Sequence, residues 1–144
     1  MKRDLYPQFR KTAERFFLPF ARAALFVIYT WFGMLKVLGV SPAGELVHRL
    51  FDRTIYFMSF GTFYILFAWF EVLIGILFLF PRFTRIAIIL FLLHMLMVFL
   101  PLVLLSATTW QSPFVPTLEG QYILKNLALI ACVLGIAARS KKTE

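Results

Sequence analysis

Four apolar runs, each about as long as a lipid bilayer is thick, constrain this chain more than any other feature. They cover residues 18–40, 59–80, 86–105 and 120–138. A helix that crosses a membrane needs about 20 consecutive, mostly apolar residues. We therefore predict an all-α protein in which residues 1–144 form a single membrane domain, a four-transmembrane-helix bundle.

The composition agrees with lipid as the main solvent. The chain is 61% hydrophobic and 15% charged, whereas a soluble domain is about 45–50% apolar. Because its net charge is +8, nucleic acid must be considered as a partner. Most of that charge, however, lies at the two termini and in one short loop, which membrane topology explains better. We expect the lipid bilayer, and no nucleic acid, as a partner.

The chain contains one cysteine, Cys132, which lies inside the fourth apolar run. A single chain of this sequence can therefore hold no disulfide, no C-x-x-C motif and no cysteine-based metal site. This argues against the thiol–disulfide class of quinone-coupled membrane enzymes, which needs pairs of cysteines.

The segment after the first run has the pattern of a short amphipathic helix. Ser41 and Pro42 suit the N-cap and the first position of a helix. The next residues alternate with helical spacing between apolar and polar types, with Leu46, Val47, Leu50 and Phe51 on one face and Glu45, His48, Arg49 and Asp52 on the other. We expect an extracytoplasmic surface helix over residues 42–53 that covers the mouth of the bundle.

The remaining segments connect or flank the spans. Residues 1–17 mix cations with aromatic residues, which is typical of a short amphipathic segment on lipid headgroups or of a frayed, solvated terminus. Pro19 then falls near the first turn of the first span, where its missing N–H matters little. We expect a turn-rich loop over residues 106–119 and a kink near Pro101.

The distribution of cations predicts the orientation. With the N-terminus inside, the outer loops hold only Arg49 and Arg53. The inner flanks then hold Lys2, Arg3, Arg10, Lys11, Arg15, Arg22, Arg82, Arg85, Arg139, Lys141 and Lys142. Short cytoplasmic loops carry the excess of Lys and Arg. We therefore predict cytoplasmic N- and C-termini, in a bacterial plasma (inner) membrane.

Four ionisable residues lie at membrane depth: Lys36, Glu71, His94 and Lys125. At roughly 1.5 Å per residue, Lys36 lies about 6 Å and Lys125 about 7–8 Å below the outer boundary. Glu71 and His94 lie near the midplane. All four can line one outward-facing cavity, because ionisable groups inside membranes usually face a cavity or a partner.

Each of these residues also has a simpler interpretation. The two lysines can extend to the outer headgroups. Glu71 can be a protonated or hydrogen-bonded group on a helix interface, and His94 a satisfied interior histidine. The other ligand-pocket candidates are Trp31, which can wall the cavity or pack in the core, and Asn126, which can touch a ligand or bond between helices.

The residue types favour an anionic or quinone-like ligand. Lysine and asparagine can donate hydrogen bonds to a carbonyl oxygen, while Glu71 and His94 can relay protons. Quinone is the candidate cofactor. A metal is not expected, because Glu71 and His94 supply too few ligands, and the second histidine that a haem would need, His48, lies in the surface helix.

An ordered set of short motifs resembles the DoxX-like family of small four-helix integral membrane proteins, in an uncharacterised subgroup. The motifs are Arg22 with Gly33 and Lys36, then Glu71 to Gly75, Pro81 to Arg85, and Leu124 to Leu127. The resemblance implies a four-helix bundle. It also implies, as for some members, a subunit of a quinone-linked oxidoreductase system. It supplies no catalytic residues, and His94 is not part of the pattern.

These observations lead to three hypotheses of function. The first is an accessory or ligand-binding subunit of a quinone-linked redox system, whose own catalytic role is left open. The second is a small transporter or proton-coupled membrane protein. The third is a structural membrane partner with no chemistry of its own. A redox protein and a second copy of this chain are the candidate protein partners.

Overall fold

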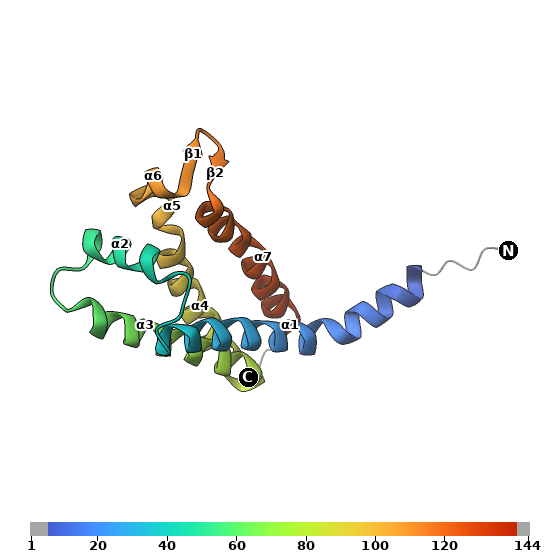
Figure 1. Cartoon of the computed structure of the whole chain (residues 1–144). Helices are drawn as coiled ribbons and strands as arrows, with labels where there is room; N and C mark the ends of the chain where they lie inside the picture. Colours follow the sequence, from blue (N-terminus) through green and yellow to red (C-terminus); the bar gives the residue numbers. More distant parts are fainter. Residues whose placement is uncertain (1–5, 141–144) are drawn as a thin grey trace.

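The structure, a computed structural model, describes residues 6–140 and is mainly helical (Figure 1). Four helical segments are long and apolar enough to cross a membrane: Tyr6–Val37, Phe60–Leu79, Pro81–Leu104 and Leu118–Arg139. The prediction of four such helices is confirmed, and they indicate an integral membrane protein.

The first helix, α1 (Tyr6–Val37), is longer than predicted. Its 32 residues span about 48 Å at 1.5 Å per residue, against a hydrocarbon core of about 30 Å. Pro19 lies inside this helix, so the helix begins well before the predicted start of the span at residue 18, and residues 6–17 are not a frayed terminus; their position on lipid headgroups stays a prediction. The exposed ion pair between Arg10 and Glu14 (2.9 Å) adds a few tenths of a kcal/mol to this helix, less than the roughly 3 kcal/mol that an interior proline costs. Residues 1–5 lie outside the described part of the chain.

Glycine permits close packing of α1 against α3 (Phe60–Leu79). A Cβ atom on Gly33 of α1 would lie 2.7 Å from Val72 Cγ2 and 2.9 Å from the carbonyl oxygen of Ala68. A Cβ atom on Gly75 of α3 would lie 2.7 Å from Thr30 Oγ1. Small residues at such crossings let two backbones approach closely in a membrane. The two glycines therefore hold α1 and α3 in one register.

The helix α2 (Gly44–Thr54) follows a turn in which Gly39 has a φ of 71°. It begins after Ala43, so Ser41 and Pro42 precede the helix instead of starting it; Ser41 Oγ accepts a hydrogen bond from the Ala43 N–H at 3.3 Å. Phe51 of α2 is buried against the rings of α3, 5.2 Å from that of Phe63. The side of the membrane on which α2 lies stays a prediction.

The end of the molecule that lies away from α2 is tied together by Arg22. Its guanidinium donates to the Phe78 carbonyl oxygen (3.0 Å), to Thr84 Oγ1 (2.7 Å) and to Ser140 Oγ (3.3 Å). These partners lie at the end of α3, at the start of α4 (Thr84–Phe99) after the short helix η1 (Pro81–Phe83), and just beyond α7 (Leu118–Arg139). Arg22 thus joins three helix ends to α1.

The segment between α4 and α7 is more ordered than the expected loop. The helix breaks at Leu100, and α5 (Pro101–Leu104) and α6 (Ser106–Thr109) follow. Next comes a hairpin of β1 (Trp110–Ser112) and β2 (Val115–Pro116). Thr117 then caps α7, because its hydroxyl accepts the Gly120 N–H at 3.2 Å. The turn residues were visible in the sequence, but the pairing of such short strands was not.

The last helix, α7, contacts α1 near its C-terminal end and diverges from it towards the hairpin (Figure 1). A Cβ atom on Gly135 would lie 2.5 Å from Phe17 Cζ, and the Arg139 guanidinium lies 4.3 Å from the centre of the Phe17 ring. The N-terminal part of the bundle and the end of α7 therefore lie at the same end of the molecule.

The close packing of α1 on α3 can be tested with single alanine substitutions. We expect Gly33→Ala and Gly75→Ala each to lower the free energy of unfolding by about 1–3 kcal/mol, the usual effect of overpacking. The control is Gly61→Ala, which has open space around its Cβ and should be neutral or slightly stabilising. Unfolding in detergent by heat or by dodecyl sulfate measures all three, and equal effects would contradict the packing described.

Candidate functional site

A buried ion pair joins α1 to α3 in the middle of the molecule. Lys36 Nζ lies 2.6 Å from Glu71 Oε2, and both residues are almost fully shielded, with 5% and 6% of their surface exposed. Lys36 occupies the last turn of α1, where the helix dipole favours a cation. The turn at Gly39, which has a positive φ, follows the end of α1. The Lys36 side chain lies on the face of α1 that packs against α3, where it reaches Glu71.

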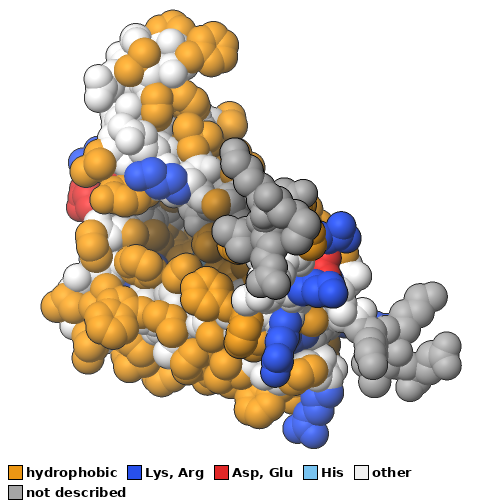
Figure 2. Space-filling model, turned by 90° about the vertical axis from the view of Figure 1, so that its right-hand side faces the viewer, with side chains coloured by type: hydrophobic (Ala, Val, Ile, Leu, Met, Phe, Trp, Pro, Cys, Tyr) orange, Lys and Arg blue, Asp and Glu red, His pale blue; other side chains and the backbone are white. Residues whose placement is uncertain are grey.

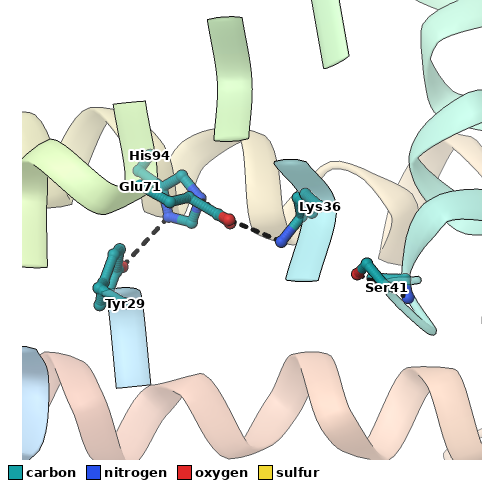
Figure 3. Close-up of polar contacts among 6 residues, drawn as sticks. Tyr29, Lys36, Ser41, Glu71 and His94 are labelled. Carbon is teal, nitrogen blue, oxygen red and sulfur yellow. Dashed lines mark hydrogen bonds and ion pairs between the residues drawn. The ribbon is translucent and has the colours of Figure 1, made fainter. Parts of the chain in front are cut away.

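A histidine and a tyrosine extend this pair into a chain of four residues (Figure 3). His94 Nε2 of α4 lies 3.0 Å from Glu71 Oε1, and the Tyr29 hydroxyl lies 3.1 Å from His94 Nδ1. A carboxylate only accepts hydrogen bonds. In the neutral imidazole, Nε2 therefore carries the proton and Nδ1 accepts from Tyr29. Every donor in the chain thus points towards Glu71.

The helix geometry explains why these side chains meet. Tyr29, Gly33 and Lys36 lie at positions i, i+4 and i+7 of α1, on one face of the helix. That face meets the face of α3 that carries Glu71 and Gly75. The close backbone approach at the glycines brings the lysine within reach of the carboxylate.

Aromatic rings pack around the hydrogen-bonded chain that runs from Tyr29 to Lys36. The Phe67 ring stacks on the His94 ring, with centroids 5.2 Å apart, and it also lies 5.8 Å from Lys36 Nζ. The Tyr29 ring contacts the His94 ring edge-on at 5.3 Å. Such surroundings lower the local dielectric constant, which strengthens the interactions within the chain and penalises any polar group left without a partner.

All four residues line a cavity of about 580 Å³ enclosed by α1, α2, α3, α4 and α7. This volume falls within the roughly 300–1,000 Å³ of small-molecule sites. The polar chain forms one part of the wall, and Ser41 lies beyond Lys36 towards α2 (Figure 3). Most of the remaining wall is apolar, including Leu46 and Leu129.

The structure brings four of the six predicted pocket residues to this cavity. Lys36, Glu71 and His94 form the chain just described, and Asn126 of α7 lines the cavity as well. The Asn126 amide nitrogen donates to the carbonyl oxygens of Tyr122 and Ile123 on its own helix, each at 3.1 Å.

Trp31 and Lys125 do not line the cavity. Trp31 is 65% exposed on the outside of α1, since it lies about 200° around the helix from Tyr29. Lys125 is exposed, with its ammonium 5.2 Å from the centre of the Tyr122 ring. The sequence gives the position of each residue along its helix, but it did not show which side of the helix Trp31 and Lys125 occupy relative to the cavity.

Tyr29 was missed at the level of the sequence. Unlike Lys36, Glu71 and His94, it is an aromatic residue of a type that is frequent in membrane helices, and in so aromatic a sequence its ring gave no reason to choose it. The available signal was its spacing: it precedes Lys36 by two helical turns and shares its face of α1. A hydroxyl on the face that carries an intramembrane ion is a reason to include such a residue.

Comparisons with protein-family models, with curated proteins and with solved structures found no match to this chain.

The ion pair can be tested by removing one partner and then both. We expect Lys36→Met or Glu71→Gln alone to lower the free energy of unfolding by about 3–5 kcal/mol, since each leaves a buried polar group or charge without its partner. The double variant Lys36→Met/Glu71→Gln should recover much of this loss, because buried pairs are often replaceable by uncharged residues.

The matched control for these variants is Lys125→Met, which removes an exposed lysine and should change stability little. Unfolding in detergent followed by circular dichroism gives the comparison. A double variant that is as unstable as the sum of the single variants would contradict the coupling of Lys36 to Glu71.

Proposed function

We propose that this chain is a DoxX-like membrane protein that binds a small lipophilic ligand of the quinone type in its central cavity, as the ligand-binding subunit of a quinone-linked redox system. The observation that carries the proposal is the chain of Tyr29, His94, Glu71 and Lys36, buried at membrane depth and exposed to a cavity of about 580 Å³.

The energetics favour a binding role for the ion pair over a purely stabilising one. Two charges removed from water lose several kcal/mol of hydration each, which their mutual attraction repays only with good geometry and further hydrogen bonds. Apolar residues of similar size would hold α1 and α3 together as well. Charged groups retained inside a membrane therefore usually serve a ligand, an ion or a proton.

The chemistry of the wall suits a ligand with a carbonyl oxygen. An ammonium has three N–H donors, and Glu71 Oε2 accepts one from Lys36. The other two have no hydrogen-bond partner among the described residues, and Lys36 lines the cavity, where a carbonyl oxygen can accept them. The apolar wall matches a flat ring with an apolar substituent. His94 lies next to Glu71 and Tyr29 next to His94, so these residues can supply or accept a proton when such a ligand is reduced or oxidised.

Two contacts support the DoxX-like assignment. The resemblance rests in part on Lys36 in the first span and Glu71 in the second, and these residues form the ion pair. It also rests on Arg22 and on the turn that contains Thr84, which share a hydrogen bond of 2.7 Å. Motif residues far apart in the sequence are thus partners in space.

The proposed orientation follows the cations. Arg82, Arg85 and Arg139 belong to the helix ends that Arg22 joins, away from α2. An excess of Lys and Arg marks the cytoplasmic side, so we place this end in the cytoplasm of a bacterial cell and α2 outside. The basic end is then the surface available to a redox-protein partner.

The binding of a quinone tests this proposal. We expect the purified protein to bind decylubiquinone, and the double variant Lys36→Met/Glu71→Gln to bind it on the order of 10- to 100-fold more weakly, since a hydrogen bond to a charged group contributes about 1.5–3 kcal/mol. Native mass spectrometry of the detergent-solubilised protein and a fluorescence titration measure the two affinities.

The control variant Lys125→Met also loses a lysine, but one outside the cavity, and should bind decylubiquinone as the wild type does. The proposal fails if the wild-type protein binds no quinone, or if the double variant binds it with unchanged affinity.

A second candidate is a proton-coupled transporter, which the unbroken hydrogen-bonded chain favours. In that case proteoliposomes under an imposed pH gradient should move protons, as read by a pH-sensitive dye inside them. Glu71→Gln should abolish this movement, because a neutral amide cannot bind and release the proton. Proton movement that persists in Glu71→Gln, or its absence from the wild-type protein, would exclude this candidate.

A further inference from the structure

Some residues that line the cavity are also exposed on the outside of the molecule. Phe32 of α1 is 48% exposed, and Tyr122 of α7 is 61% exposed. The cavity therefore reaches the surface beside α1 and α7; Leu118 and Glu119 at the start of α7 also line it and are exposed. The face of the molecule seen in Figure 2 is hollowed, with hydrophobic side chains beside and below the hollow and a basic side chain above it.

The divergence of α7 from α1 creates this opening. The two helices are in contact at Phe17, Gly135 and Arg139, and they separate towards the hairpin (Figure 1). Phe32 and Tyr122 lie in the separated half. We call the gap that these two residues flank the lateral mouth.

The lateral mouth lies between two of the helices that are long and apolar enough to cross a membrane, α1 and α7. Phe32 lies five residues before the end of α1, and Tyr122 four residues after the start of α7. At 1.5 Å per residue these positions are about 7.5 Å and about 6 Å inside the helix ends. Both flanking side chains are aromatic, as is common at the boundary between headgroups and hydrocarbon.

The ion pair belongs to the buried polar part of the cavity wall, Glu119 and Asn126 of α7 add polar groups, and most of the remaining wall is apolar. The ion pair of Lys36 with Glu71 is neutral overall, so the polar wall favours a neutral head group with hydrogen-bond acceptors over a phosphate. Val98 and Leu129 belong to the apolar wall. The cavity volume is that of a small-molecule site, which suits one head group and part of one chain.

We infer that the occupant of the cavity enters from the bilayer through the lateral mouth. It is a single-tailed amphiphile whose neutral, acceptor-bearing head reaches Lys36 and whose tail leaves between Phe32 and Tyr122. The inference rests on the proposed function for the identity of the head group. The path of the tail rests on the geometry of the mouth alone.

Two quinones with the same head test the path of the tail. Decylubiquinone carries a ten-carbon chain, and 2,3-dimethoxy-5-methyl-1,4-benzoquinone lacks it. We expect Phe32→Arg to weaken the binding of decylubiquinone by about 10-fold, since about 1.5 kcal/mol of apolar contact is lost. The same variant should bind the quinone without a tail as the wild type does, which also shows that the site has folded.

The matched control is Trp69→Arg on α3. Trp69 is an aromatic residue of similar exposure, 52%, and does not line the cavity. This variant should bind both quinones as the wild type does. The inference is overturned if Phe32→Arg weakens both quinones alike, if it weakens neither, or if Trp69→Arg has the same effect.

A second measurement is independent of any quinone. In a chain whose three native tryptophans are replaced by phenylalanine, the Phe51→Trp reporter lines the cavity, whereas the Phe78→Trp reporter lies in the core and away from it; both positions are buried. A fatty alcohol with a brominated chain, added to bilayer vesicles, should quench the first reporter more strongly than the second.

Equal quenching of the two reporters overturns the inference. Selective quenching at position 51 in a protein that binds no quinone supports entry from the bilayer and rejects the quinone function. The two proposals can therefore fail separately.

Discussion

The ion pair between Lys36 and Glu71 is the interaction on which the rest of the structure depends. A single charge at this depth would lose several kcal/mol of hydration with nothing to replace it. The last turn of α1 and the middle of α3 must therefore meet, and only one register of the two helices lets them do so. Gly33 and Gly75 make that register sterically available, because any larger residue there would separate the backbones. The ion pair thus favours one packing of α1 on α3, and Gly33 and Gly75 make that packing sterically possible.

The same pair also determines the properties of the cavity beside it. Because the two charges cancel, the cavity wall is polar without being strongly charged, and the spare donors of Lys36 favour neutral acceptors. His94 and Tyr29 extend the wall by hydrogen bonds that all point towards Glu71. Loss of any one member leaves a buried polar atom without its partner. The chain is therefore expected to respond as a unit to a ligand or to a proton.

The sequence predicted the four long helices better than the direction of the side chains on them. The spans follow from the length of the apolar runs, whereas the depth of Lys36 and Glu71 in a bilayer stays a prediction. The rotation of each helix depends on contacts between spans, which one sequence does not display. Trp31 therefore faces outward and Lys125 lies on the surface, while the uncharged Tyr29 completes the site. The continuation of α1 through Pro19 shows that a proline in the first turn of an apolar run does not mark the start of the helix.

The shape of the cavity follows from how α7 is held. At its C-terminal end, Phe17 packs on Gly135, and Arg22 reaches Ser140. At its N-terminal end, the Thr117 N–H donates to the Thr109 carbonyl oxygen at 3.0 Å. Both ends are thus anchored to different parts of the chain, and the segment between them does not need to close on α1. A preformed cavity needs little rearrangement to receive a ligand, which lowers the free-energy cost of binding. The apolar gap between α1 and α7 is therefore better explained by the anchoring of the two ends of α7 than by loose packing.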